Sequence, residues 1–129
     1  MILNIVIGIA VLVVLYYLFP LIQVVGDSMY PTYKDGEIIV GTRLYLKSNL
    51  KYDDVILYRS PVDGKVVIKR VCLIKKDKNK LYFYCLGDNL DFSNDSRNYG
   101  FVSSKNIICK VLNQRGNKND VYSQKRWDS

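Results

Sequence analysis

The sequence predicts a mainly β fold, in which a single N-terminal transmembrane helix is followed by a compact antiparallel β domain. Two observations carry this prediction. Residues 2–25 are almost continuously apolar and contain no charged side chain, whereas the rest of the chain alternates polar turns with short segments rich in Val, Ile, Tyr and Phe. A chain of 129 residues can hold one domain of modest core. We expect an anchor over residues 1–25, a domain over residues 26–112 and a polar C-terminal tail over residues 113–129.

The apolar N-terminal segment is long enough to span a bilayer, whose hydrocarbon core takes about 20 helical residues. Tyr16, Tyr17 and Phe19 suit the membrane interface, and Pro20 is a position at which the helix can end or kink. The alternative is a cleavable secretory signal, but the segment lacks the basic start and the small-x-small cleavage site of such signals. We expect a permanent, single-pass anchor in the cell membrane.

The net charge of +7 arises entirely after this segment. A basic surface can bind nucleic acid, but beside a membrane anchor anionic lipid head groups are the better partner, so we expect no nucleic-acid partner. No Lys or Arg precedes the apolar segment, and the first ones after it are Lys34 and Arg43. The positive-inside rule, taken alone, would keep the domain in the cytoplasm.

Five segments of the domain are expected to be strands, because they are rich in β-branched and aromatic residues and are bounded by turn residues. The expected strands are residues 37–41, 54–58, 65–74, 81–86 and 106–112. Turn residues gather between them at residues 34–36, 60–64, 77–80 and 89–97. No long helical period occurs among these segments, which favours an antiparallel β domain.

The chain contains no histidine, and its three cysteines show no Cys-x-x-Cys spacing. We therefore expect neither a metal site nor a cofactor. Cys72, Cys85 and Cys109 lie among apolar residues and are expected to be buried free thiols, with a disulfide between Cys72 and Cys85 as the alternative. Without histidine, a catalytic serine needs another base.

Three segments carry a resemblance to a known family. Residues 26–32 read Gly-Asp-Ser-Met-Tyr-Pro-Thr, residues 67–71 read Val-Ile-Lys-Arg-Val, and residues 87–100 begin with Gly-Asp-Asn, continue through Ser-Asn-Asp-Ser-Arg and end with Gly. In this order they resemble the nucleophile, lysine and third motifs of bacterial type I signal peptidases, the Ser-Lys dyad leader peptidases, in a short form. Gly-Asp-Ser-Met also occurs in LexA-like self-cleaving repressors, but the third segment favours the signal peptidase.

The resemblance implies a membrane-bound serine endopeptidase with a β-rich, LexA-like catalytic domain that removes signal peptides from secreted preproteins. It places the catalytic domain on the extracytoplasmic face, opposite to the orientation that the charges alone favour. Only residues 70–92 separate Lys69 from Ser93, where many bacterial relatives carry a longer insertion. The chain therefore resembles a minimal version of the fold.

Ser28 and Lys69 are the expected catalytic pair. A serine hydroxyl attacks an amide only when a neighbouring group accepts its proton, and a lysine accepts a proton only when it is neutral. Burial disfavours the charged amine. Lys69 fits that role because strand alternation puts it in an apolar row with Val67, Val71 and Leu73, whereas Arg70 faces the other way. A lone lysine in an apolar strand more often reaches out to solvent, and the matching serine motif decides for the base.

The resemblance further implies that Ser93 and Asp95 support the lysine, Ser93 as an acceptor for its amine and Asp95 as a carboxylate that fixes the network. For Asp95, a structural salt bridge with Arg97 is an equal alternative. The Ser28 backbone N–H is the expected first donor to the oxyanion. Some relatives supply a second donor from a serine two positions before the nucleophile, where this chain has Gly26, so the second donor is unassigned.

An extended peptide is the expected substrate, bound by two strand edges that flank the catalytic pair. By resemblance, the peptide carries small side chains at the first and third positions before the scissile bond, and Met29 helps to shape the site rather than only fill the core. The expected substrate-binding residues are Val24, Val25, Gly26, Asp27, Met29, Val66, Val67 and Ile68.

Two other functions stay open at this point. A LexA-like self-cleaving peptidase would require an attached DNA-binding region, and the hydrophobic N-terminus argues against it. A non-catalytic, membrane-anchored β module that binds peptides is favoured by the short segment between Lys69 and Ser93.

Overall fold

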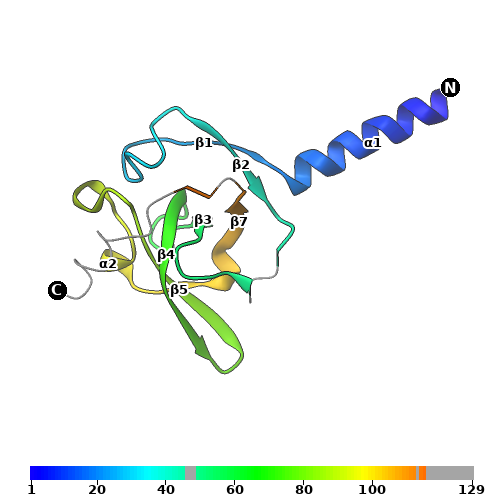
Figure 1. Cartoon of the computed structure of the whole chain (residues 1–129). Helices are drawn as coiled ribbons and strands as arrows, with labels where there is room; N and C mark the ends of the chain where they lie inside the picture. Colours follow the sequence, from blue (N-terminus) through cyan, green and yellow to red (C-terminus); the bar gives the residue numbers. More distant parts are fainter. Residues whose placement is uncertain (46–48, 113, 116–129) are drawn as a thin grey trace.

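The structure, a computed structural model, describes residues 1–45, 49–112 and 114–115. An N-terminal helix leads into a seven-stranded sheet (Figure 1) whose neighbouring strands are all antiparallel. The elements are α1 (Ile2–Leu18), β1 (Leu21–Gln23), β2 (Ile38–Thr42), β3 (Val55–Arg59), β4 (Val66–Asp77), β5 (Lys80–Leu86), η2 (Leu90–Phe92), α2 (Ser96–Tyr99), β6 (Val102–Ser103), η3 (Ser104–Asn106) and β7 (Ile107–Val111). The strand order in the sheet is β1-β2-β7-β3-β4-β5-β6.

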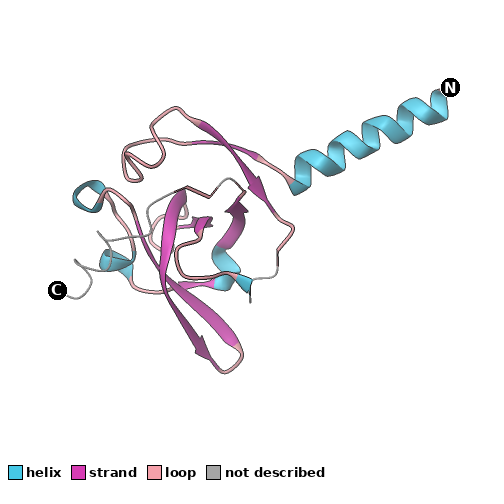
Figure 2. Cartoon of the chain, viewed as in Figure 1, coloured by secondary structure: helices cyan, strands magenta, loops and turns pink. Residues whose placement is uncertain are grey.

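The N-terminal helix α1 projects away from the β domain (Figure 2), and none of its residues is buried. Within the described residues, no helix is both long and apolar enough to cross a membrane, so the expected transmembrane helix is not supported. The helix ends at Leu18, two residues before Pro20, because proline has no N–H to continue the hydrogen-bond ladder. The next residues, which the apolar pattern assigned to the anchor, form β1, and Val24 is only 3 % exposed.

The end of α1 is fastened to the strand β2. The backbone N–H of Arg43 donates to the carbonyl of Leu18 over 2.8 Å, and the N–H of Gly41 donates to the carbonyl of Pro20 over 2.8 Å. The Arg43 guanidinium donates to the carbonyl of Tyr17 and lies 4.6 Å from the centre of the Tyr17 ring. The bonds to Tyr17 and Leu18 satisfy carbonyl groups that the last turn of a helix leaves without partners.

The five expected strands are confirmed as β2, β3, β4, β5 and β7. Their ends differ from the expected ones by at most one residue, except that β4 continues to Asp77. It does so because Asp77 pairs with Lys80 across a two-residue turn in which Lys78 and Asn79 both have positive φ (48° and 68°), the conformation that tight hairpins require.

The core lies on both faces of β3. Val55 and Leu57 pack into one apolar cluster with residues of β1, β2 and β7, and Ile56 and Tyr58 pack into a second cluster with residues of β4, β5 and β7. A strand that is buried on both faces reads as a continuous apolar run rather than an alternating one.

The three cysteines are buried and free. The expected free thiols are therefore confirmed, and the alternative disulfide between Cys72 and Cys85 is wrong. Burial raises the pKa of the Cys85 and Cys109 thiols.

Two residues of the expected polar tail pack against the domain. The Gln114 side chain pairs with both backbone groups of Val55, at 2.8 and 3.1 Å. The N–H of Arg115 donates to the hydroxyl of Tyr33 over 3.0 Å. The domain thus continues at least to Arg115, and the rest of the expected tail lies outside the described residues.

Candidate active site

Ser28 lies in the loop that follows β1. Gly26 has a φ of +87°, a backbone conformation that glycine adopts without a steric penalty, and its N–H donates to the carboxylate of Asp35 over 2.8 Å. On the other side of the serine, Met29 is 1 % exposed and its carbonyl accepts the N–H of Tyr33 over 2.9 Å. The buried Met29 and the bonded Gly26 hold Ser28 at the surface of the domain between them.

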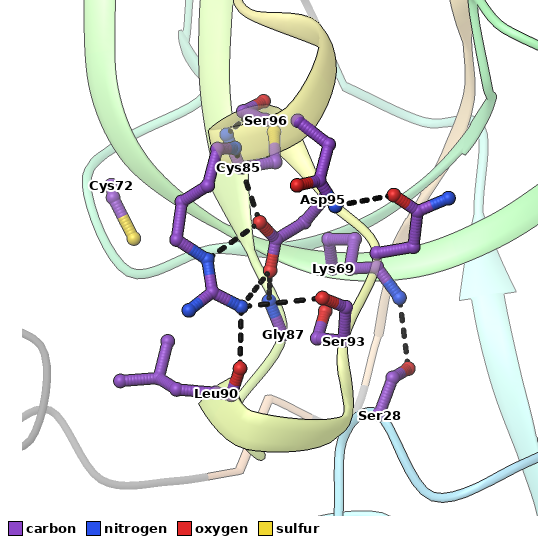
Figure 3. Close-up of polar contacts among 12 residues, drawn as sticks. Ser28, Lys69, Cys72, Cys85, Gly87, Leu90, Ser93, Asp95 and Ser96 are labelled. Atoms are coloured by element: carbon purple, nitrogen blue, oxygen red, sulfur yellow. Dashed lines mark hydrogen bonds and ion pairs between the residues drawn. The ribbon is translucent and has the colours of Figure 1, made fainter.

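The amine of Lys69 lies 2.8 Å from the hydroxyl oxygen of Ser28, as Figure 3 shows. Lys69 belongs to β4, where it is paired with Ile56 of β3, and only 4 % of it is exposed. The two residues come from separate elements, 41 positions apart in the chain. The fold thus brings together the pair that the sequence singles out.

Burial lowers the pKa of the Lys69 amine below its ordinary value of 10.5, because a low-dielectric surrounding disfavours the charged form. The negative charge of Asp95 opposes this shift and raises the pKa. The net effect makes a neutral amine, the form that can accept a proton from Ser28, more accessible than it is for a lysine in water.

Leu73, which was expected to share an apolar face of β4 with Lys69, does not lie on that buried face. The pairing of β4 with β5 shifts between Val71 and Leu73, and Leu73 is 42 % exposed. The expected alternation therefore fails after Val71, because a bulge in an antiparallel pair changes the face to which later side chains point. Arg70 is also buried, and its guanidinium pairs with the carboxylate of Asp88 at 2.8 Å.

Asp95 is fully buried and organises the third motif (Figure 3). Its carboxylate accepts the N–H of Gly87 over 3.0 Å, caps α2 through the N–H of Arg97, and pairs with the Arg97 guanidinium at 2.9 Å. Burial disfavours the charged carboxylate, but these hydrogen bonds outweigh it and hold the pKa of Asp95 below its usual value. The salt bridge between Asp95 and Arg97, which was expected as one alternative role for Asp95, is present.

Ser93 lies near Lys69 and Ser28 in Figure 3 and packs against Gly87. Its buried hydroxyl has no hydrogen-bond partner within the described part of the chain, so the expected bond to the Lys69 amine is not formed in this structure. A Cβ atom on Gly87 would lie 2.2 Å from the Ser93 hydroxyl oxygen, so only glycine fits there.

A cavity of about 120 Å³ opens between the loop that carries Ser28 and the strand that carries Lys69. Both Ser28 and Lys69 line it, together with five of the residues expected to bind substrate: Val24, Val25, Val66, Val67 and Ile68. The first part of β4 pairs with β3 on one side, and its pairing with β5 begins only at Arg70. Among the described residues, no strand pairs with residues 66–69 on the other side, so a peptide can add there as a further strand.

The other three residues expected to bind substrate lie elsewhere. Met29 belongs to the apolar core, where its sulfur accepts the N–H of Asp88 over 3.3 Å. Met29 does not line the cavity at Ser28 and Lys69, and its expected role in shaping the substrate site stays a prediction. Gly26 holds the loop through its backbone, and Asp27 lines a second cavity that lies beside the loop.

Asn89 and Gly87 contact the loop that carries Ser28, although neither was expected to be a catalytic or supporting residue. The N–H of Asn89 donates to the carbonyl of Ser28 over 2.8 Å, and its side-chain amide donates to the carbonyl of Asp27 over 3.0 Å. These bonds fasten the third motif to the nucleophile loop. The Gly-Asp-Asn segment indicates a shaped loop, but the sequence does not show what that loop contacts.

The comparisons with known proteins agree with this geometry. No curated protein matches the chain. A family model described as "Signal peptidase, peptidase S26" matches residues 1–78, which is more than half of the chain. The chain therefore belongs to the S26 family of signal peptidases.

Proposed function

We propose that this chain is a serine endopeptidase that cleaves signal peptides from secreted preproteins, with Ser28 as the nucleophile and Lys69 as the general base. The observation that carries the proposal is the 2.8 Å separation between the Lys69 amine and the Ser28 hydroxyl. Membership of the S26 family supports peptidase chemistry. The absence of histidine from the chain favours a lysine as the base.

The proposed reaction begins with a neutral Lys69. Its amine accepts the hydroxyl proton of Ser28 while the serine oxygen bonds to the carbonyl carbon of the scissile peptide. The tetrahedral intermediate then collapses, the C–N bond breaks, and the Lys69 ammonium gives its proton to the leaving amine. Water then gives a proton to Lys69 while its oxygen bonds to the ester carbon. This second tetrahedral intermediate collapses, the C–O bond to Ser28 breaks, and the Lys69 ammonium returns its proton to the Ser28 oxygen, which restores the hydroxyl and the neutral amine.

The oxyanion of the intermediate needs hydrogen-bond donors, and the loss of one such donor typically costs about 10²–10³ in rate. We propose the backbone N–H of Ser28 as the first donor. Gly26 brings no hydroxyl, and its own N–H donates to Asp35. A second donor would therefore have to come from a different residue or from water.

The substrate is proposed to lie as an extended strand along residues 66–69, with its scissile bond at Ser28. The unpaired edge of β4 offers main-chain groups, and the cavity of about 120 Å³ beside it suits small side chains. This fits the small residues at the first and third positions before the scissile bond that the resemblance implies.

The protein is proposed to act at the cell membrane, with α1 embedded in lipid and the catalytic domain on the extracytoplasmic face. All of α1 is apolar apart from Asn4, and no residue of it packs against the domain core. Apolar surface of this extent is stabilised by transfer out of water. Protease protection in intact cells tests the orientation: degradation of the domain by external protease supports it, and complete protection contradicts it.

The catalytic proposal is tested with purified full-length protein in detergent and a preprotein substrate. Ser28→Ala and Lys69→Met should each lower cleavage by about 10⁴-fold or more, because either change removes a member of the pair. Lys105→Met, at an exposed lysine away from the site, is the matched control and should cleave normally. Cleavage that survives either active-site substitution would rule out the dyad. A wild-type protein that binds the preprotein without cleaving it would indicate the peptide-binding module instead.

A further inference from the structure

A second cavity lies beside the nucleophile loop. It has a volume of about 180 Å³ and is lined by Asp27, Tyr30, Asn89 and Phe92. None of these four lines the cavity at Lys69. Tyr30 is 49 % exposed and Phe92 is 74 % exposed, so two aromatic side chains border this cavity without being buried by the domain.

The two aromatic side chains are held outward by buried neighbours. Met29, which precedes Tyr30, lies in the core, and Leu90, at the start of η2, packs with Cys72 and Leu86. The N–H of Phe92 donates to the carbonyl of Asn89 over 3.0 Å, which closes the short helix and leaves the Phe92 ring at the surface. Buried residues next to Tyr30 and Phe92 therefore fix both walls of the cavity, one in the loop after β1 and one in η2.

The two cavities are lined by residues that are neighbours in the chain at Ser28. Ser28 lines the first cavity, and the preceding residue, Asp27, lines the second. Asn89 joins the two loops through its bonds to the carbonyls of Ser28 and Asp27. The loops lie next to each other in Figure 1. A peptide that crosses Ser28 from the groove at residues 66–69 would reach Tyr30 and Phe92 after its scissile bond.

We propose that this cavity is the subsite for a side chain of the first two residues after the scissile bond, and that it prefers a bulky apolar or aromatic side chain. The inference rests on the proposed function. A cavity of about 150 Å³ is large enough to hold a benzene ring, so about 180 Å³ accommodates an aromatic side chain. The carboxylate of Asp27 at the wall disfavours an acidic side chain.

The test uses the full-length protein in detergent and a set of fluorogenic peptides that share one signal-peptide cleavage sequence. The peptides differ only in the residue after the scissile bond or in the next one, each being Phe, Ala or Asp. The readout is the ratio of kcat/KM for the Phe peptide to kcat/KM for the Ala peptide, taken within each variant so that differences in folding cancel. We expect the wild type to prefer Phe by about 2- to 10-fold at one of the two positions.

Phe92→Ala and Tyr30→Ala should each move this ratio toward one. Asp27→Asn should raise cleavage of the Asp peptide relative to the Ala peptide by about two- to fivefold. Phe101→Ala is the matched control and should keep the wild-type ratio. Phe101 is an exposed aromatic residue that packs edge-to-face against Tyr84, with ring centroids 5.3 Å apart, and it lines neither cavity.

Three outcomes would overturn the inference, and they differ from one another. If the wild type cleaves all peptides equally well, the subsite is wrong and the proposed function stands. If no peptide is cleaved, both the proposed subsite and the proposed function are wrong. If the Phe to Ala ratio of Phe92→Ala equals that of the wild type while its binding to phosphatidylglycerol vesicles weakens, the aromatic pair contacts lipid rather than substrate.

Discussion

A side chain on Gly87 would collide with Ser93. A Cβ atom built on this glycine lies 2.2 Å from the Ser93 hydroxyl oxygen and 2.6 Å from the carbonyl oxygen of Ser28. The third motif therefore packs directly on the backbone of Ser28. Asp95 holds Gly87 in this place through its bond to the Gly87 N–H.

Gly87→Ala should damage both stability and activity. The Ser93 side chain can move away, but the backbone of Ser28 must shift as well, so the substitution overpacks the site. We expect a loss of about 1–3 kcal/mol in the free energy of unfolding, and a fall in kcat/KM of about 10²-fold, since displacements of about 1 Å at a reacting group have that effect. Urea unfolding and peptide cleavage measure the two.

Gly64→Ala provides the comparison for Gly87→Ala. Gly64 has a φ of +73° but open space around its Cβ position, so its substitution strains the backbone without a collision. It should lower stability and leave kcat/KM near the wild-type value. Equal kcat/KM for the two variants would show that the Gly87 contact does not position Ser28.

The activity should rise with pH through the pKa of Lys69. Catalysis needs the neutral amine, and burial lowers the pKa of Lys69 below 10.5. The acid limb of a plot of kcat/KM against pH should therefore have its midpoint below 10.5, with activity lost at lower pH as the amine becomes charged. An acid limb centred at or above 10.5 would contradict a buried base.

Stability gives a second measure of the same pKa. The unfolded chain binds more protons than the folded one between the folded pKa of Lys69 and 10.5, so this residue makes the free energy of unfolding rise with pH in that window. Lys69→Met removes the buried charge. The gain in the free energy of unfolding of Lys69→Met over the wild type should be greatest at pH values below the folded pKa of Lys69. This gain should become smaller as the pH approaches 10.5. A difference that grows with pH would mean that the pKa is raised.

The pH profile also separates the two roles considered for Asp95. Its negative charge raises the pKa of Lys69, so Asp95→Asn should move the acid limb of kcat/KM to lower pH. A purely structural role would lower the rate without moving the limb. Arg97→Gln breaks the same salt bridge but keeps the carboxylate, and its acid limb should stay where the wild type has it.

Five of the seven strands in the described sheet could be predicted from local patterns, because each is bounded by turn residues and rich in β-branched or aromatic residues. The strand β6 could not be predicted because it has only two residues. The strand β1 could not be predicted because residues 21–23 continue an apolar run that begins in α1. Apolar composition does not show where a helix ends and a buried strand begins. Only the pairing of Leu21 with Val40 and of Gln23 with Ile38 sets that boundary.

The proximity of Ser28 and Lys69 could be predicted because both residues stand in motifs that resemble one family, in a chain without histidine. The residues that surround Ser28 and Lys69 could not be predicted, because their positions depend on tertiary packing. Met29 has the same neighbours in sequence whether it points into the core or into the groove, and the structure places it in the core. The contact of Asn89 with the Ser28 carbonyl joins segments that local patterns treat separately.

Gly26→Ser tests whether a hydroxyl at this position can serve the oxyanion. The φ of +87° means that any side chain is strained here, although space is open around the Cβ position, and we expect a cost of about 1–2 kcal/mol in stability. Gly26→Ala carries the same strain without the hydroxyl. If the serine donates to the oxyanion, kcat should be higher for Gly26→Ser than for Gly26→Ala. Equal kcat values would exclude the hydroxyl as a donor.

Arg43 is expected to set the orientation of α1 relative to the catalytic domain, since its guanidinium binds the Tyr17 carbonyl and stacks on the Tyr17 ring. Arg43→Ala removes both contacts, whereas the backbone bond to Leu18 remains. If α1 lies in lipid, this change should lower cleavage of a membrane-inserted preprotein several-fold more than cleavage of a soluble peptide. Lys105→Ala, which removes an exposed charge elsewhere, should affect neither. Equal losses on the two substrates would mean that Arg43 supports the domain itself and does not orient the helix.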